Sequence, residues 1–306
     1  MPSPRKPIVV VGSVSMDLVT VTPKIPRIGQ TVVGTSFGTT PGGKGANQAV
    51  AAARLGYPTR MVGKVGRDVY GPALLENLAS SGVLIDGMEQ VDGASGLAPI
   101  FVSESGENAI VIVQGSNGKV DRATVDRHAD LIHSAGIVLC QLELPIDTTC
   151  YVLELCSAAG VPTILDPAPA APLPDSAFSH ISWFTPNETE AAFYLGESLS
   201  VEEGAKRLFD RGLKGVVLKR GGEGSYVAVA GGHAAWVKPF HVQAIDTVAA
   251  GDCFNGAFAV ALMEGNTPWE AARFANAAAA ISVTRRGAQQ SMPSRAEVDL
   301  CLTEHA

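Results

Sequence analysis

The chain has 306 residues, of which 46% are hydrophobic and 17% charged, so it can bury the core of one large α/β domain and is not expected to be disordered. Its formal net charge of −7 leaves no broad basic surface, which argues against nucleic acid or an anionic membrane as a partner. The five cysteines are odd in number and form no C-x-x-C pair, so neither a disulfide framework nor a structural zinc site is expected, and a cytoplasmic protein fits best.

The first predicted element is an apolar run at 8–11, which is too short for a signal peptide or a membrane span and indicates a strand. Further β-branched runs alternate with Ala- and Leu-rich runs of helical spacing, the pattern of β-α-β units around a parallel sheet. Strands are predicted at 8–11, 59–62, 137–139, 163–165, 183–185 and 216–218, and helices at 47–55, 72–80, 123–133, 147–159, 188–195 and 201–211. A hairpin (225–229 and 234–237), long helices (252–263 and 268–284) and a terminal helix from Ser294 follow.

Two stretches, 17–40 and 96–113, do not fit this alternation. They alternate polar and apolar residues between Gly and Pro turns, as antiparallel strands with one exposed face do. Together they predict a small sheet inserted at two points of one domain. Because open α/β sheets bind ligands at the carboxyl ends of their strands, such a sheet would form a lid over a ligand.

The first predicted helix opens with the glycine-rich segment T-P-G-G-K-G-A-N-Q-A-V. Gly38, Gly43 and Lys44 have the G-x-x-x-x-G-K spacing of a P-loop, but Gly45 offers no hydroxyl to a Mg²⁺ ion and no clean strand precedes Gly38. A P-loop NTPase is therefore rejected. What remains is a glycine-lined pocket floor on which Lys44 and Asn47 suit sugar hydroxyls, or else a bare turn before a helix.

Polar groups recur just past the carboxyl ends of predicted strands, where each alone would be a turn or cap more often than a ligand. Their recurrence at equivalent places in the sheet favours a binding site. They are S-M-D at 15–17, Q-L-E-L-P at 141–145 and T-P-N-E-T-E at 185–190. The glycine loop K-R-G-G-E-G at 219–224 also follows a predicted strand and is consistent with nucleotide contact or equally with an ordinary hairpin entry.

The late segment D-T-V-A-A-G-D-C-F-N-G leads from small residues directly into a helical run. The amides of Ala249, Ala250 and Gly251 would point out of the helix N-terminus and form a cradle for phosphate oxygens. Asp252, at the same end, would be stabilised in its charged form and could accept a hydroxyl proton. The alternative is that Asp252 only caps the helix.

Both signatures of the ribokinase-like (PfkB) carbohydrate kinase family occur in order, P-G-G-K-G-A-N-Q-A early and D-T-x-A-A-G-D-x-F-N-G late. The chain resembles this family essentially from Ile8 to Ser291. Q-L-E at 141–143, D-P-A-P at 166–169 and T-P-N-E at 185–188 resemble its ribokinases more than its fructokinases or adenosine kinases. The resemblance implies a three-layer α/β/α domain with a mostly parallel sheet, a small lid shared across a homodimer, and transfer from ATP to the 5-hydroxyl of D-ribose.

The resemblance also implies a role for each matching residue. Asp252 would take the hydroxyl proton beside the amides of Ala249, Ala250 and Gly251. The sugar would be held by Asp252 with Ser15, Met16, Asp17, Gly43, Lys44, Gly45, Ala46, Asn47 and Glu143. ATP would contact Gly251 and Asp252 with Asn187, Lys219, Arg220, Gly221, Gly222, Glu223, Gly224 and Asn276. Mg²⁺ would be ordered through water by Glu190, and K⁺ would be held, partly through backbone carbonyls, by Asp246, Val248, Ser282, Arg285, Gly287 and Ser291.

Two positions depart from the family pattern. Ser15 stands where many ribokinases have Asn, which weakens the case for ribose itself, and Val248 stands where Thr is common. Rival functions are a kinase of the same family acting on deoxyribose, a nucleoside or a hexose, and a non-catalytic sugar-binding protein. A dehydrogenase would need G-x-G-x-x-G after the first strand, where this chain has G-S-V-S-M-D.

Overall fold

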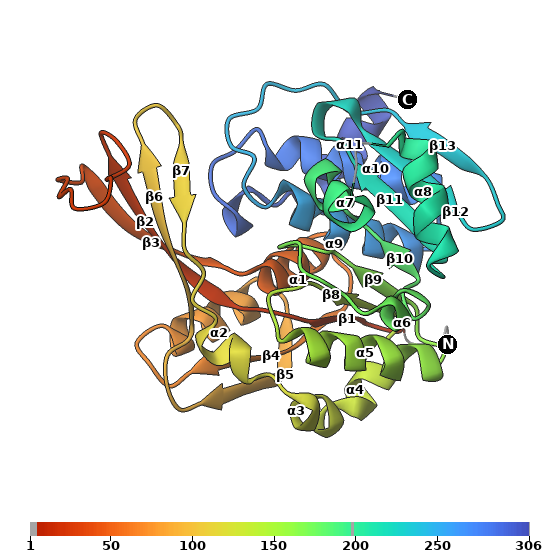
Figure 1. Ribbon diagram of the computed structural model, residues 1–306, viewed down its shortest axis with the longest axis horizontal. Helices are drawn as coiled ribbons and strands as arrows, with labels where there is room; N and C mark the ends of the chain where they lie inside the picture. The colour runs from red at the N-terminus through yellow and green to blue at the C-terminus, as the bar shows by residue number, and fades with distance from the viewer. Residues whose placement is uncertain (1–4, 197–198, 306) are drawn as a thin grey trace.

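A nine-stranded sheet forms the centre of the molecule in the computed structural model, which describes residues 5–196 and 199–305 (Figure 1). The strand order is β13-β12-β11-β10-β9-β8-β1-β4-β5. The strands from β11 to β5 run parallel, and β12 and β13 add an antiparallel hairpin at one edge. Their bounds are β1 Ile8–Val11, β4 Thr59–Gly66, β5 Leu84–Val91, β8 Ile137–Cys140, β9 Thr163–Leu165, β10 Trp183–Phe184, β11 Gly215–Lys219, β12 Ser225–Val229 and β13 Ala234–Val237.

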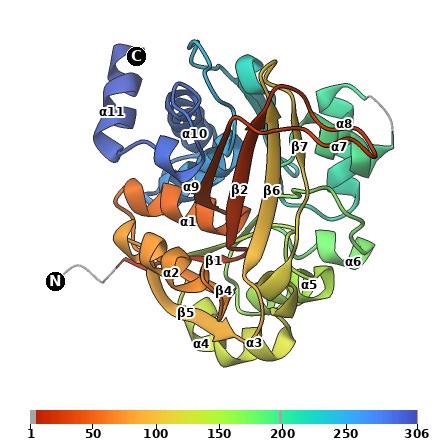
Figure 2. The ribbon, with the colours of Figure 1, turned by 90° about the vertical axis from the view of Figure 1, so that its left-hand side faces the viewer.

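Helices cover both faces of this sheet, which is why its central strands are apolar throughout. In β1, Ile8 and Val10 pack into the core on one face, and Val9 and Val11 into the core on the other. The first face carries α1 Lys44–Arg54, α2 Gly71–Ser80, α9 Ala250–Met263, α10 Pro268–Ser282 and α11 Arg295–Glu304. The second face carries α3 Arg122–Arg127, α4 Ala129–His133, α5 Ile146–Ala158, α6 Asp175–Phe178, α7 Glu188–Leu195 and α8 Val201–Asp210. Figure 2 shows α1, α10 and α11 of the first group on one side and α5, α6, α7 and α8 of the second on the other.

A second sheet of four strands, ordered β3-β2-β6-β7, projects from the large domain (Figures 1 and 2). It is built from the two predicted insertions, and we call it the lid. Strand β2 follows β1 after only three residues, so the lid is a direct continuation of the central sheet's middle strand. Its strands are β2 Ser15–Thr22, β3 Ser36–Gly42, β6 Gly96–Ser103 and β7 Asn108–Ile110.

Three details differ from the sequence-based expectation. The lid is mixed rather than antiparallel, because β2 pairs with β6 in parallel. The helix expected at 123–133 is interrupted at His128, where α3 ends and α4 begins. Strand β5 was not predicted, since its sequence LIDGMEQV carries charged and polar side chains at an edge of the sheet. In the described ranges, no helix has the length and apolarity needed to cross a membrane.

Candidate active site

The site lies where the parallel strands end, because their carboxyl ends all meet one edge of the sheet. Ser13 follows β1, Glu143 follows β8, Asp166 follows β9, and Asn187 follows β10. Lys219 is the last residue of β11. The polar groups predicted at 141–145 and 185–190 and the start of the glycine loop therefore lie along this edge, whereas the group predicted at 15–17 lies on lid strand β2.

Helix α9 directs its N-terminus at this edge. Its N-cap is Ala249, which has a left-handed backbone with φ of 58° and no side-chain cap. A residue other than glycine pays a steric cost there, and such strain concentrates at functional sites. The Ala250 amide was predicted to be free, but it donates to the Thr247 carbonyl at 3.3 Å. Within the described residues, the Ala249 and Gly251 amides have no protein acceptor and remain available to an anion.

Asp252 lies in the first turn of α9 and is 4% exposed. It does not cap the helix, which removes the alternative interpretation of this residue. Its Oδ2 accepts from Asn47 Nδ2 at 2.9 Å, and its Oδ1 accepts from Gln48 Nε2 at 3.1 Å. The glycine-rich bend at the start of α1 is thus in direct contact with the late helix, as the kinase hypothesis requires.

Close helix packing keeps these two segments together. A Cβ on Gly256 of α9 would lie 2.7 Å from both the Ala51 Cβ and the Gln48 carbonyl oxygen of α1. Only glycine allows the two backbones to approach so closely. The contact lies one turn beyond Asp252, so it sets the distance from Asp252 to α1.

Burial raises the pKa of Asp252, and the Asp166 carboxylate adds to this effect. The Lys44 ammonium and the amides of Asn47 and Gln48 oppose it. Burial also disfavours the charge on Lys44, yet the carboxylates of Asp252, Asp166 and Glu143 outweigh that effect and raise its pKa. A buried carboxylate with a raised pKa beside a fixed cation is well suited to accept a proton.

Behind Asp252, a buried polar network reaches across the sheet. Gln48 Nε2 also donates to Asp166 Oδ2 at 2.9 Å, and Gln141 Nε2 donates to Gln48 Oε1 at 2.7 Å. Lys219 Nζ donates to Asp166 Oδ1 at 3.0 Å. A Cβ on Gly251 would lie 3.3 Å from Lys219 Nζ, so this ammonium stands over the N-terminus of α9. Sequence reasoning missed Gln48 and Asp166 as individual site residues, although both belong to the segments it identified.

The residues predicted to hold a sugar surround the base of the lid. Glu143 Oε2 accepts from Ser13 Oγ at 2.5 Å and from the Lys44 amide at 3.0 Å. Burial raises the pKa of Asp17, on lid strand β2, to about 6, and the negative charges of Glu143 and Asp252 add to the rise, while a hydrogen bond from Ser15 opposes it. These carboxylates therefore lie near one another and can accept from the hydroxyls of one ligand.

The remaining predicted sugar residues supply backbone rather than side chains. Gly43 has φ of 89°, and a Cβ there would meet the Ser15 amide at 2.8 Å. A Cβ on Gly45 would lie 2.5 Å from the Ser13 amide. The side chains of Met16 and Ala46 are buried in the core, so these two residues can offer a ligand only their backbone.

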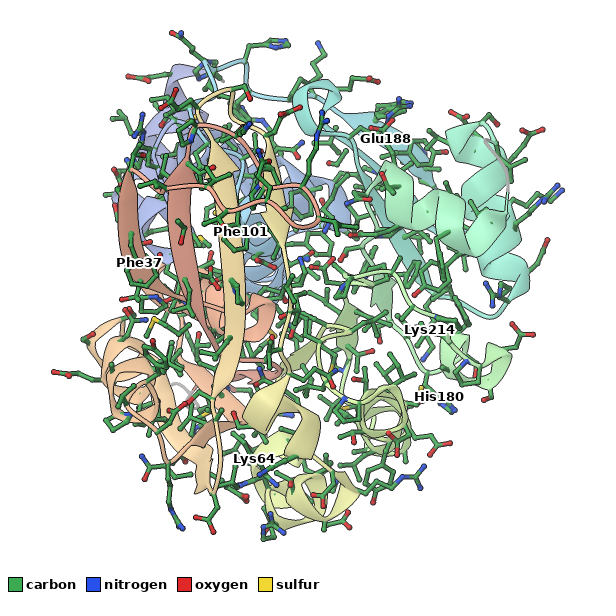
Figure 3. The ribbon with its side chains drawn as sticks, turned by 60° about the vertical axis from the view of Figure 1, so that its left-hand side comes forward. Phe37, Lys64, Phe101, His180, Glu188 and Lys214 are labelled. Atoms are coloured by element: carbon green, nitrogen blue, oxygen red, sulfur yellow. The ribbon has the colours of Figure 1, made fainter. Side chains whose placement is uncertain are left out.

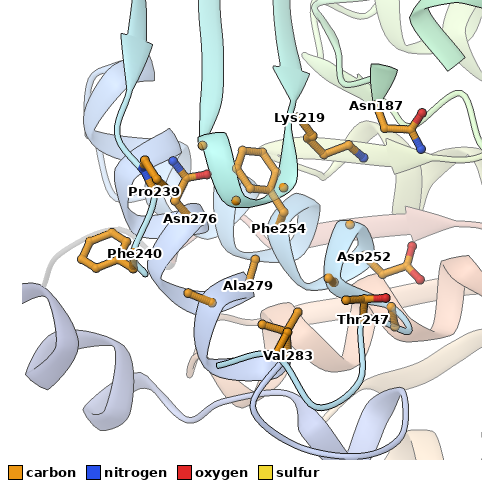
Figure 4. A pocket seen from close by; sticks show the side chains of 18 of the residues that line it. Asn187, Lys219, Pro239, Phe240, Thr247, Asp252, Phe254, Asn276, Ala279 and Val283 are labelled. Atoms are coloured by element: carbon orange, nitrogen blue, oxygen red, sulfur yellow. The ribbon is translucent and has the colours of Figure 1, made fainter. Parts of the chain in front are cut away.

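A cavity of about 490 Å³ adjoins Asp252. Asn187, Lys219 and Asp252 lie toward one end of it, and Pro239, Phe240 and Asn276 toward the other (Figure 4). Asn276 Nδ2 donates to the carbonyls of Val237 and Lys238, which fixes the segment leading into Phe240. The predicted nucleotide residues that line this cavity are Asn187, Lys219, Gly221, Gly222, Gly224, Gly251, Asp252 and Asn276.

Arg220 and Glu223, which were also predicted to contact the nucleotide, do not line the cavity. Arg220 pairs with Glu188 of α7 at 2.7 Å and with Glu223 at 3.4 Å. The pairs direct these side chains toward α7.

Glu190 lines the same cavity from the first turn of α7. It accepts from the backbone amide of Asn187 at 2.8 Å and from its Nδ2 at 3.0 Å, so the two residues form a capping box. Burial raises the pKa of Glu190, and the Lys219 ammonium opposes the rise. Asn187 caps α7, which is the alternative that the sequence left open for this group, and its partner carboxylate faces the cavity.

Of the residues proposed for potassium, Val248 and Gly287 contact Asp246. Its Oδ1 accepts from the Val248 amide at 3.0 Å, and its Oδ2 accepts from the Gly287 amide at 2.9 Å. The Val283 carbonyl accepts from the Asp246 amide at 3.2 Å. The Arg285 guanidinium pairs with Glu297, which leaves its carbonyl as the group it could offer a cation.

Comparison with known proteins shows close relatives of the whole chain. The pattern of the pfkB family carbohydrate kinases matches residues 5–295. The chain is 45% identical to a ribokinase of Bacillus subtilis, covering 97% of this chain and 99% of that protein, and 35% identical to a deoxyribokinase of Salmonella typhi, covering 94% and 95%. The solved structure of Arabidopsis thaliana ribokinase complexed with ribose and ATP superposes with a TM-score of 0.92 at 36% identity, covering 97% of this chain and 98% of that one.

Proposed function

This chain belongs to the pfkB family of carbohydrate kinases, and we propose that it is a ribokinase that transfers the γ-phosphoryl group of ATP to the 5-hydroxyl of D-ribose. The observation that carries this proposal is the contact between Asp252, at the N-terminus of α9, and Asn47 of the glycine-rich bend, at 2.9 Å. It joins a proton acceptor to a group of sugar-binding side chains at the end of a cavity large enough for a nucleotide.

The chemistry follows from the groups around this contact. Asp252 accepts the hydroxyl proton while the sugar oxygen forms a bond to the γ-phosphorus, and the bond from that phosphorus to the oxygen of the leaving ADP breaks. The Ala249 and Gly251 amides and the Lys219 ammonium stabilise the negative charge on the phosphoryl oxygens. Asp17, Asn47 and Glu143 orient the sugar, so that its hydroxyl and not water meets the phosphoryl group.

Two metal ions fit the donor groups that the site offers. Glu190 faces the nucleotide cavity with a carboxylate, the group that Mg²⁺ favours, and would hold it through water. For K⁺, the carbonyls of Val248, Arg285 and Gly287 would be the oxygen donors beside Asp246, together with Ser282 and Ser291, whose hydroxyls donate to the carbonyls of Ala279 at 2.8 Å and Ala288 at 2.7 Å. When bound, Mg²⁺ neutralises phosphate charge and K⁺ orders the loop beside α9.

Ser15 favours 2-deoxyribose as a second candidate substrate. It replaces the asparagine common in ribokinases, and its hydroxyl donates to Asp17 Oδ1 at 3.3 Å. The rate of ADP release, measured with D-ribose, 2-deoxyribose, adenosine and fructose as acceptors, tests both candidates. We expect the highest kcat/KM with ribose and a product phosphorylated at the 5-oxygen by ³¹P NMR. A preference for another member of the panel would reassign the substrate, and no ADP with any sugar would favour a non-catalytic protein.

We also propose that the lid pairs with the lid of a second copy of this chain. Phe37 and Phe101 both lie opposite Thr20 in the strand register, so their side chains share one face, and Phe37 is 66% exposed (Figure 3). The adjacent segment 110–113 exposes four consecutive apolar residues. An exposed apolar patch of this kind marks an interaction surface. Sedimentation velocity should report a dimer that Phe37→Asp dissociates, whereas Leu300→Asp on α11, a comparably exposed residue, leaves it intact.

A further inference from the structure

A chain of side-chain amides leads from α2 to the Asp252 carboxylate. Asn77 Nδ2 donates to Gln289 Oε1 at 2.6 Å, Gln289 Nε2 donates to Asn47 Oδ1 at 3.1 Å, and Asn47 Nδ2 donates to Asp252 Oδ2 at 2.9 Å. Gln289 is 3% exposed and Asn47 is 6% exposed, so water does not compete for the bonds from Gln289 to Asn47 and from Asn47 to Asp252.

The direction of each bond in this chain is fixed by the one before it. An ionised carboxylate only accepts hydrogen bonds, so Asn47 must present its NH₂ group to Asp252 and its carbonyl oxygen to another donor. Gln289 is that donor, because its own carbonyl oxygen is already used by Asn77. If the Gln289 amide were reversed, two carbonyl oxygens would face each other, and Asn47 would be driven to turn its oxygen toward Asp252.

Gln289 is itself held firmly in place. It opens the short 3-10 turn Gln289–Ser291, and Arg54 of α1 donates to its backbone carbonyl at 2.7 Å and to that of Met292 at 3.2 Å. The same loop carries Gly287 and Ser291, which we propose as potassium ligands. Gln289 therefore connects that loop to the sugar-binding bend by a side-chain contact.

We propose that Gln289 is a positioning residue, which fixes the amide of Asn47 so that its NH₂ group holds the catalytic carboxylate. The inference rests on the proposed kinase function. It assigns to Gln289 no contact with the nucleotide, since the residue does not line the cavity. Its effect on turnover passes through Asn47.

Two substitutions of nearly equal size separate orientation from packing. Gln289→Glu keeps an acceptor for Asn77 but, when ionised, replaces the donor to Asn47 with a second acceptor. Asn47 should then reverse its amide. Gln289→Met removes both polar ends and leaves Asn47 free to keep its bond to Asp252. The matched control is Gln290→Glu, the same change at the exposed neighbouring residue.

We expect Gln289→Glu to lower kcat for ribose by about 10- to 100-fold at pH 8 with an unchanged KM for ATP. This fold-change corresponds to the loss of one charge-assisted hydrogen bond. The acid limb of its kcat profile should also move to higher pH. The hydrogen bond from Asn47 lowers the pKa of Asp252, so losing that bond raises this pKa, while the charged neighbours of Asp252, which are Lys44, Asp166 and Asp17, stay in place. Gln289→Met should lose less than about fivefold, and Gln290→Glu should match the wild type.

Two results would overturn the inference alone: a Gln289→Glu enzyme with kcat within twofold of the wild type, or a Gln289→Met enzyme impaired as much as Gln289→Glu. The first result would mean that Gln289 only fills space, and the second that loss of its hydrogen bonds, and not reversal of the Asn47 amide, lowers turnover. A wild-type protein that phosphorylates no sugar would overturn the proposed function and this inference with it, so the two failures are distinguishable.

Discussion

Asp252→Asn tests the proposed base with a minimal change in shape. In the wild type each carboxylate oxygen accepts one amide, from Asn47 at 2.9 Å and from Gln48 at 3.1 Å. Asparagine has one acceptor and one NH₂ group, so one of these two donors loses its partner. The substitution also removes a buried negative charge, whose desolvation raises the pKa of Asp252.

These two effects on stability oppose each other. Loss of a hydrogen bond to a charged acceptor costs about 1.5–3 kcal/mol, while removal of an unfavourably buried charge returns a similar amount. The free energy of unfolding should therefore change by less than about 2 kcal/mol. Turnover should fall by roughly 10²–10⁴, since an amide cannot accept the hydroxyl proton.

The assay is ADP release under saturating ribose and ATP, with ribose affinity measured by calorimetry and unfolding followed in urea. Asp210→Asn, a change at an exposed position of α8, is the control. The wild type should lose turnover as the pH falls through the raised pKa of Asp252, because the base must be unprotonated, and the variant should lose that limb. An Asp252→Asn enzyme that folds and turns over within tenfold of the wild type would refute the assignment.

Three further changes probe the surroundings of the site. The pKa of Asp17 rises from 3.8 to about 6 on folding, so the folded state binds this proton more tightly and the wild type loses at most about 3 kcal/mol of stability as the pH rises from 4 to above 6. Asp17→Asn should remove this loss in urea titrations, and an unchanged pH dependence would contradict the burial argument. Ala249→Gly should leave the melting temperature equal or higher, because it relieves φ of 58°, and a drop of several degrees would show that no strain is stored there. Gly256→Ala should destabilise by about 1–3 kcal/mol and slow turnover by separating α1 from α9. Gly204→Ala on α8, where the added methyl meets only the tip of Leu195, is its control, and equal losses in both variants would contradict the close-approach argument.

Most of the main sheet could be predicted, because buried parallel strands are continuous apolar runs. The bounds of β1 and β9 were predicted to the residue. Strand β5 was missed because an edge strand with Asp86 and Glu89 lacks such a run. The parallel pairing of β2 with β6 could not be inferred, since it depends on where β2 leaves β1 and not on any local pattern.

Short motifs pointed to residues that the structure brings together, through backbone at Gly43 and through side chains at Asn47 and Asp252. Other side chains of the same network were missed. Glutamine is usually found at the protein surface, and only the folded structure shows that Gln48 and Gln289 are buried beside Asn47 and Asp252. Met16 was included with its motif neighbours, although strand alternation directs its side chain into the core.

The short connection between β1 and β2 has a consequence for selectivity. Asp17 belongs to the projecting sheet, whereas Asn47 and Asp252 are anchored in helices of the large body. A molecule that satisfies only the anchored pair can dock without drawing the projecting sheet inward. We expect the protein to discriminate between sugars mainly by whether a sugar contacts both the projecting sheet and the large domain and so closes the site. The initial binding affinity should matter less.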